Sequence, residues 1–266
     1  MIHLMVSVFR PRWAHPVGGL LVALFMALPM PGWARASLPV LILHSYNLEY
    51  PWTQGQHDGF VRGLRQSGYE DLAISTEYLD TKRRPIDAAY ARAFTDFLRV
   101  KYAGYRPALI YVTDDDALLF ARDHLAGLFP GSPVFFSGVN DYGARAWLDP
   151  ARMTGVFEKK EIAPNLGLLR QLDAAARSIV LVGDGGHTYR AIEREARRDL
   201  RRFPEITATF VAKPEIDSLL ETLRARPEKY LVLTTLGGLT DHEGRVVPLR
   251  ERSEERRVGK ECRSRW

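Results

Sequence analysis

The chain contains almost no cysteine, since Cys262 is the single one among 266 residues. Everything before that position therefore lacks disulfides, and no thiol is present there to act as a nucleophile or a metal ligand. The sequence also lacks a G-x-S-x-G nucleophile turn, an H-E-x-x-H zinc motif and a Walker lysine. The histidines after the N-terminal region show no spacing typical of paired metal ligands. They are His44, His57, His124, His187 and His242. We therefore expect a protein that is not an enzyme and that binds neither a metal nor a cofactor.

Long hydrophobic runs are scarce as well. An apolar stretch covers residues 17–30, which is short for a bilayer span of roughly 20 residues. Arg10 and Arg12 precede this stretch, and a small-residue A-x-A site follows at residues 34–36. This order is typical of a secretory signal peptide, with an uncleaved signal anchor as the alternative. Either interpretation predicts a periplasmic or otherwise extracytoplasmic location for the chain from Ser37 onward, with membrane anchoring of the intact protein left open.

The excess of positive charge comes from the two ends. The whole chain has a net charge of +5, but residues 37–251 hold 28 basic and 29 acidic residues. Residues 252–266 show no apolar periodicity and resemble the translation of a sequencing adapter, so we exclude them as an artefactual tail. A net charge of −1 over the remaining region predicts no nucleic-acid partner.

Between the two ends, strand-like and helix-like segments alternate. Segments with continuous or alternating apolar residues predict strands at 39–44, 72–78, 108–112, 133–137, 155–157, 178–182, 206–211 and 230–235. Segments with apolar residues at three- and four-residue spacings predict helices at 52–65, 85–102, 116–128, 162–175, 187–202 and 216–225. Strands that alternate with helices imply an α/β fold with parallel sheets built from right-handed βαβ units.

The alternation is interrupted once, at residues 140–152. This segment contains Gly143 and Pro150 and has no clear periodicity, so we expect the chain to cross between two lobes there. The expected organisation is a signal peptide at 1–36, a first lobe at 37–141, an incomplete second lobe at 142–251 and the tail at 252–266. Each lobe would be a doubly wound parallel sheet.

Polar and aromatic residues follow several of the predicted strands. In sheets of this kind the ligand lies beyond the carboxyl ends of the strands. The candidate ligand-binding residues are therefore His44, Ser45, Tyr46, Trp52, Asp114, Asp115, Ser137, Gly138, Asn140, Asp184 and Thr235. Trp52 would supply a flat wall for a small organic ligand, although packing against the core is the alternative.

Several of these candidates have a simpler structural interpretation. The run Asp114-Asp115-Asp116 invites a metal site, but consecutive residues at a helix start cannot all face one ion. Capping of the following helix and contact with a ligand amine are the other possibilities for these carboxylates. His44, Ser45 and Tyr46 could merely cap the next segment. The glycine-rich loop at 183–186 is only a weak sign of an anion site, since it lacks the full dinucleotide fingerprint.

Four strings carry a family resemblance: LILHSYNLEYPWTQ, EYLDTKR, LIYVTDDDAL and LFPGSPVFFSGVND. In this order they resemble the periplasmic sensor domain related to ABC-transporter substrate-binding proteins. That domain stands at the front of bacterial sensor histidine kinases and diguanylate cyclases. The resemblance covers about residues 38–251. It implies two lobes joined by a hinge, with a ligand in the cleft, and some relatives take aromatic amino acids. The final strands that return to the first lobe are missing here.

The resemblance favours an extracytoplasmic sensor that binds a small organic ligand, possibly an amino acid, and acts on a membrane-linked signalling module. The alternative is a free solute-binding protein that delivers its ligand to an ABC permease. A hydrolase on the same α/β scaffold is a third possibility, which would require a nucleophile and a base that converge in the cleft.

Overall fold

The computed structural model describes residues 37–247. The expected signal peptide at 1–36, the end of the expected second lobe at 248–251 and the tail at 252–266 lie outside the described residues. Among the helices of residues 37–247, none is long and apolar enough to cross a membrane.

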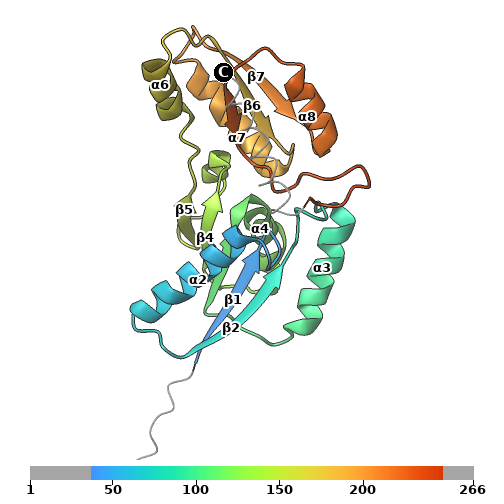
Figure 1. The fold of residues 1–266 in the computed structure, drawn as a ribbon. Helices are drawn as coiled ribbons and strands as arrows, with labels where there is room; N and C mark the ends of the chain where they lie inside the picture. Colours follow the sequence, from blue (N-terminus) through green and yellow to red (C-terminus); the bar gives the residue numbers. More distant parts are fainter. Residues whose placement is uncertain (1–36, 248–266) are drawn as a thin grey trace, which may run out of the picture. The chain divides into compact units, whose positions relative to one another are not determined.

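Five parallel strands form the first sheet, in the order β2-β1-β3-β4-β5 (Figure 1). They are β1 (Leu38–His44), β2 (Leu72–Tyr78), β3 (Leu109–Thr113), β4 (Val134–Val139) and β5 (Met153–Phe157). The central strands β1 and β3 are buried almost throughout, which explains why their sequences are continuous apolar runs rather than alternating ones. Parallel pairing places the carboxyl ends of all five strands at one edge of the sheet.

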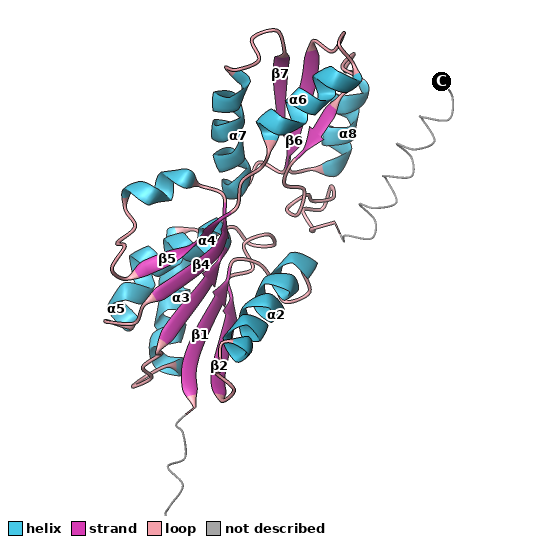
Figure 2. Cartoon of the chain, turned by 90° about the vertical axis from the view of Figure 1, so that its left-hand side faces the viewer, coloured by secondary structure: helices cyan, strands magenta, loops and turns pink. Residues whose placement is uncertain are grey.

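Helices cover both faces of this sheet (Figure 2). On one face lies α2 (Pro51–Gln66), whose Phe60, Val61 and Leu64 pack against β1 and β3. On the other face lie α3 (Ala88–Lys101), α4 (Asp114–Phe120), the π-helical turn η1 (Ala121–Leu125) and α5 (Ala126–Leu128). The predicted helix at 116–128 thus corresponds to three short consecutive pieces.

The strand β5 belongs to the first sheet, so the first lobe extends further than we expected. We expected the crossing at 140–152 and a second lobe from 142, with the strand at 155–157 as its first element. Instead, residues 142–146 form the 3-10 turn η2, whose Ala144 packs in the first core. β5 then pairs with β4 in the first sheet. The chain therefore leaves the first sheet only after Phe157. The sequence of a short strand does not show which strand it pairs with, so its sheet could not be predicted.

Three parallel strands form the second sheet, in the order β7-β6-β8. They are β6 (Ser178–Gly183), β7 (Thr207–Ala212) and β8 (Leu231–Leu233). α6 (Ile162–Leu172) and α7 (His187–Leu200) pack with one core cluster of this sheet, and α8 (Ile216–Arg224) packs with the other. The expected α/β class with parallel sheets is confirmed.

Gly183, the last residue of β6, offers a test of the second core. A β-carbon at this position would lie only 1.9 Å from Cδ2 of Tyr189, one of the largest fully buried side chains. We expect Gly183→Ala to lower the free energy of unfolding by about 1–3 kcal/mol, because the ring has no free space to enter. Urea denaturation measures this change. The control is Gly167→Ala within α6, where no atom lies within 4 Å of the added carbon. That change should be neutral or stabilise the protein, and equal effects of the two substitutions would contradict the packing described.

Candidate ligand-binding site

Three consecutive aspartates occupy the first turn of α4, directly after β3. Asp114 has a backbone φ of 65°, a left-handed conformation that is uncommon for a residue other than glycine. The turn directs the three carboxylates to three different segments. They do not converge on one ion, and residues 37–247 hold no group of three or more side chains placed to bind a metal.

Asp114 is 2% exposed and faces α2. Trp52 donates its indole Nε1–H to Oδ1 at 2.9 Å, and Gln56 donates its amide Nε2–H to Oδ2 at 3.0 Å. Burial raises the pKa of Asp114 to about 8, and the nearby charges of Asp115 and Glu158 act in the same direction. Asp114 is therefore a carboxyl group that keeps its proton at neutral pH.

Asp115 joins the end of β4 to the start of α7. Its Oδ1 accepts the backbone N–H groups of Asn140 at 3.0 Å and Asp141 at 2.8 Å. Its Oδ2 accepts the hydroxyl of Thr188 at 2.9 Å. One carboxylate thus connects a loop of the first sheet with the first turn of a helix that packs on the second sheet.

Asp116 makes a second connection of the same kind. Thr81 donates its hydroxyl to Oδ2 at 2.6 Å, and Nδ1 of His187 lies 3.3 Å from Oδ1. Burial opposes ionisation of Asp116, but the close contact with His187 and the hydrogen bond from Thr81 outweigh it and lower the pKa of this carboxyl. The same contact raises the pKa of His187.

Asp184 organises the loops at the carboxyl ends of β6 and β8. Its carboxylate accepts the Gly186 and Gly238 backbone N–H groups at 3.0 and 2.9 Å, and the Thr235 hydroxyl at 3.1 Å. Lys82, from the segment after β2, places Nζ 3.0 Å from Oδ2 of Asp184. The side chains of this ion pair are only 11% and 1% exposed, so it is nearly shielded from water.

Lys82 and Thr188 both contact Tyr46. The lysine ammonium lies 4.9 Å from the centre of the Tyr46 ring, and the Tyr46 hydroxyl lies 3.3 Å from Oγ1 of Thr188. The aromatic residue after β1 therefore lies between groups that come from both sheets.

His44 and Ser45 have local structural roles in this conformation. Both are 0% exposed. Ser45 donates to the carbonyl of Thr113 at 2.6 Å and accepts the N–H of Ala117 at 2.8 Å, so it satisfies backbone groups at the start of α4. His44 contacts Thr113 at 3.0 Å and His57 at 3.2 Å, and burial lowers its pKa to about 3. These contacts of Ser45 agree with the alternative interpretation, in which it caps the segment that follows.

The end of β4 lies against Asp114 and α2. Ser137 donates to Oε1 of Gln56 at 2.5 Å, and its hydroxyl oxygen lies 2.5 Å from the Tyr111 hydroxyl. Gly138 has a φ of 72°, and a β-carbon there would lie 2.8 Å from Oε1 of Gln56 and 3.0 Å from Oδ1 of Asp114. Glycine is favoured at this position, because the left-handed conformation strains other residues and a β-carbon would press on Gln56 and Asp114.

Most of the eleven predicted residues take part in these contacts, whereas His44 and Ser45 have local structural roles. Asp114, Ser137, Gly138 and Asn140 lie at the ends of β3 and β4, and Trp52 contacts Asp114 from the start of α2. Asp184 and Thr235 lie together beyond the second sheet. Sequence reasoning missed several residues of the same network: Gln56, Thr81, Lys82, Glu158, His187 and Thr188. The four-residue spacing of Trp52 and Gln56, which places both on one face of α2, was a usable signal.

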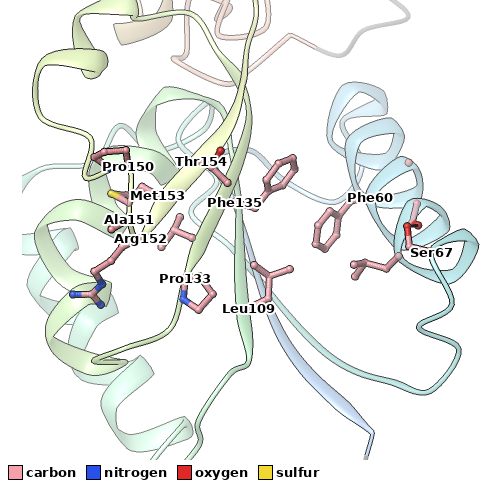
Figure 3. A pocket seen from close by; sticks show the side chains of 14 residues that line it. Phe60, Ser67, Leu109, Pro133, Phe135, Pro150, Ala151, Arg152, Met153 and Thr154 are labelled. Atoms are coloured by element: carbon pink, nitrogen blue, oxygen red, sulfur yellow. Dashed lines mark hydrogen bonds between the residues drawn. The ribbon is translucent and has the colours of Figure 1, made fainter.

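An open apolar groove of about 550 Å³ lies elsewhere, beside the second half of α2 (Figure 3). Its walls include Phe60, Leu109, Pro133 and Phe135, near the amino-terminal ends of β3 and β4. None of the predicted site residues lines this groove. Its position at the opposite ends of the strands separates it from the polar network.

No protein-family model and no curated protein sequence matches the chain. Solved structures do resemble it. One is an ABC domain in complex with L-Trp from Streptococcus pneumoniae, at a TM-score of 0.56 and 15% identity, covering 75% of this chain and 65% of that one. Another is a branched chain amino acid ABC transporter from Thermus thermophilus with bound valine, at 0.52 and 9%, covering 76% and 53%. A third is an extracellular ligand-binding receptor from Verminephrobacter eiseniae, at 0.52 and 11%, covering 75% and 57%.

These likenesses decide the fold. It is that of the periplasmic binding proteins. At such low identities the comparison shows the architecture alone, and the chain spans between half and two thirds of the length of these structures. In a periplasmic-binding-protein fold, the network described above occupies the carboxyl ends of the parallel strands, where α/β sheets bind ligands.

The buried carboxyl of Asp114 predicts a distinctive pH dependence. Its pKa is about 8 in the folded protein against an ordinary value of 3.8, so the folded state binds the extra proton. The contribution of this proton to the free energy of unfolding is fully present below about pH 4, and it is lost as the pH rises to 8. Between these values we expect wild-type unfolding free energy to fall, relative to Asp114→Asn, by on the order of a few kcal/mol. Urea titrations across this range measure the difference. The exposed Asp58→Asn should follow the wild type, and parallel curves for wild type and Asp114→Asn would show that Asp114 ionises normally.

Proposed function

We propose that the chain binds a small organic ligand through the loops that follow the strands of both sheets, as the extracytoplasmic sensor domain of a bacterial signalling receptor. The receptor would be a histidine kinase or a diguanylate cyclase. The observation that carries the proposal is the set of polar contacts joining these loops, above all Asp115 with Thr188 and Lys82 with Asp184.

These contacts provide a physical route from ligand to signal. The groups that would meet the ligand also hold the loops of one sheet against those of the other. A ligand that adds bonds to both sets of loops stabilises the arrangement in which the loops meet, relative to one in which they are apart. The size of this population shift is set by the difference in the ligand's affinity for the two arrangements. A membrane-linked module attached to the domain would respond to that shift.

Support for an organic ligand comes from the similar solved structures, one with bound L-Trp and another with bound valine. The network also offers what such ligands need, since it combines a half-exposed indole with a few oriented polar groups. The hydrolase interpretation has less support, because Ser137 bonds to Tyr111 and Gln56 rather than to a base.

The second candidate function is a free solute-binding protein that hands its ligand to an ABC permease. The similarity to a structure described as a branched chain amino acid ABC transporter favours it. The uninterrupted gene distinguishes the two. A membrane helix followed by a kinase or cyclase domain supports the sensor, and a stop codon after the last lobe strand supports transport. Either role takes place in the periplasm, after export by the expected signal at 1–36.

Trp52 provides the test of ligand binding. Its side chain is 43% exposed at the start of α2, while its N–H reaches Asp114. We expect Trp52→Ala to weaken binding of a ligand found by thermal shift by about 10- to 100-fold, because the ligand loses an aromatic wall. Isothermal titration measures the affinity. Trp52→Phe keeps a ring and should retain more of it. The control is Tyr69→Ala, an exposed aromatic beyond the far end of α2. Unchanged affinity in Trp52→Ala would remove Trp52 from the site.

A further inference from the structure

His187 is the first residue of α7, and its imidazole lies against an acid of the first lobe. Nδ1 of His187 is 3.3 Å from Oδ1 of Asp116, and the two side chains are 27% and 15% exposed. Asp116 stands in the first turn of α4, which follows β3 of the first sheet, whereas α7 packs on the second sheet. This contact therefore exists only where the loops of the two sheets meet.

The groups on α7 itself disfavour a positive charge on His187. The imidazole belongs to the first turn, where the unpaired backbone N–H groups form the positive end of the helix dipole. No side chain caps this turn. Arg190, one turn further along α7, also lowers the pKa of His187 through its charge, although these are not the largest effects on it. On the second sheet alone, the imidazole would therefore be neutral near pH 7.

The first lobe reverses this preference. The contact with Asp116 raises the pKa of His187 above its ordinary value, against the opposing effect of burial, and the charges of Asp116 and Asp115 add to it. Asp116 is itself held in place, since it accepts the hydroxyl of Thr81 at 2.6 Å and lies within the field of the Lys82 ammonium. The proton affinity of His187 thus depends on whether the acids of the first lobe lie against it.

The other ion pairs between the two sheets involve different chemistry. Lys82 pairs with Asp184 at 3.0 Å, and Arg194 of α7 pairs with Asp141 at 2.9 Å. Lysine, arginine and aspartate side chains are ordinarily charged near pH 7, whereas imidazole gains and loses its proton there. Among these contacts between the sheets, the one made by His187 is therefore the contact whose charge changes in the neutral range.

We propose that His187 and Asp116 form a pH-sensitive contact, which holds the loops of the two sheets together when the imidazole is protonated and weakens when it is neutral. The contribution is fully present below the ordinary histidine value of 6.5, and it is lost as the pH rises through the raised pKa of His187. A rise of one pH unit in that pKa corresponds to about a tenfold change in the ratio of joined to separated molecules.

The inference goes beyond ligand binding, because it concerns the chain without a ligand. A ligand and a proton would both favour the arrangement in which the loops meet, so each would strengthen the binding of the other. In the proposed location outside the cytoplasm, the domain would respond to the pH of its surroundings as well as to its ligand.

Asp114 ionises in an overlapping range, since its pKa is about 8. Its carboxyl group bonds to Trp52 and Gln56 of the first lobe, so the loss of its proton changes contacts within that lobe. An Asp114→Asn background removes this titration and leaves His187 and Asp116 in place. The two effects can therefore be measured separately.

The first experiment is a nuclear magnetic resonance titration of the histidines in the purified chain. We expect the imidazole signals of His187, assigned with His187→Gln, to report a pKa above 6.5. Asp116→Asn should lower it by about half a pH unit or more, because the facing charge is removed. The signals of His242, whose side chain is 75% exposed, should titrate identically in both proteins. A His187 pKa at or below 6.5, or one that Asp116→Asn leaves unchanged, would overturn the proposal.

The second experiment measures distances between spin labels on the two lobes. Val100→Cys in α3 and Leu172→Cys in α6 provide labelling positions that are 80% and 77% exposed. The background carries Asp114→Asn and Cys262→Ser, so that neither the other titration nor the native thiol interferes. From pH 6 to pH 9, we expect the population at the distance that dominates at pH 6 to fall at least about threefold relative to the rest.

The variants at the contact decide the cause of such a change. His187→Gln is neutral and should show the pH 9 distribution at both pH values, and Asp116→Asn should behave in the same way. His187→Lys keeps its charge over this range and should retain the pH 6 distribution. Circular dichroism checks that each variant is folded. Identical distributions at pH 6 and pH 9 in the background protein, or an equal change in His187→Gln, would refute the role of His187. Either result leaves the proposed ligand binding standing, because the titration of Trp52→Ala is made at a single pH.

Discussion

Three adjacent carboxyl groups are buried or nearly buried at the carboxyl end of β3, and the rest of the site is arranged around them. Removing a carboxylate from water is costly unless donors replace the lost hydration. A single segment cannot supply enough donors for three such groups. Asp114 therefore uses α2, Asp115 uses the loop after β4 and the first turn of α7, and Asp116 uses Thr81 and His187. The need to satisfy these groups brings together segments from both halves of the chain.

The strands of both sheets could be predicted from the sequence, because they are either apolar throughout or alternate between apolar and polar residues. The central strands β1 and β3 are examples. The sequence misassigned β5, whose Thr154 and Gly155 carry no information about a partner strand. A β-carbon on Gly155 would lie 2.1 Å from the carbonyl oxygen of Phe136, so this glycine allows close pairing with β4. Such a requirement is visible only when the partner is known.

The position of the candidate site could be predicted from the sequence, but the hydrogen-bond partners of its residues could not. Residues that follow parallel strands could be proposed from topology, and Asp114, Gly138 and Asn140 do lie together. Their partners lie far along the chain, as with Gln56 at 58 residues from Asp114 and Thr188 at 73 residues from Asp115. Local patterns cannot report such contacts. Ser45 illustrates the opposite difficulty, since a hydroxyl that follows a buried strand can satisfy backbone groups instead of facing a ligand.

The distant partners of Asp115 and Asp116 have a consequence for the order of folding. The first sheet is complete once the chain up to Phe157 is available, but Thr188 and His187 lie about 30 residues further along the chain. Until they are available, the two carboxylates have only part of their donors and must remain hydrated. The start of α4 can then close fully only when α7 docks. α7 therefore supplies the last donors to the first half, and a chain that ends before α7 would hold β3 and α4 in a looser state.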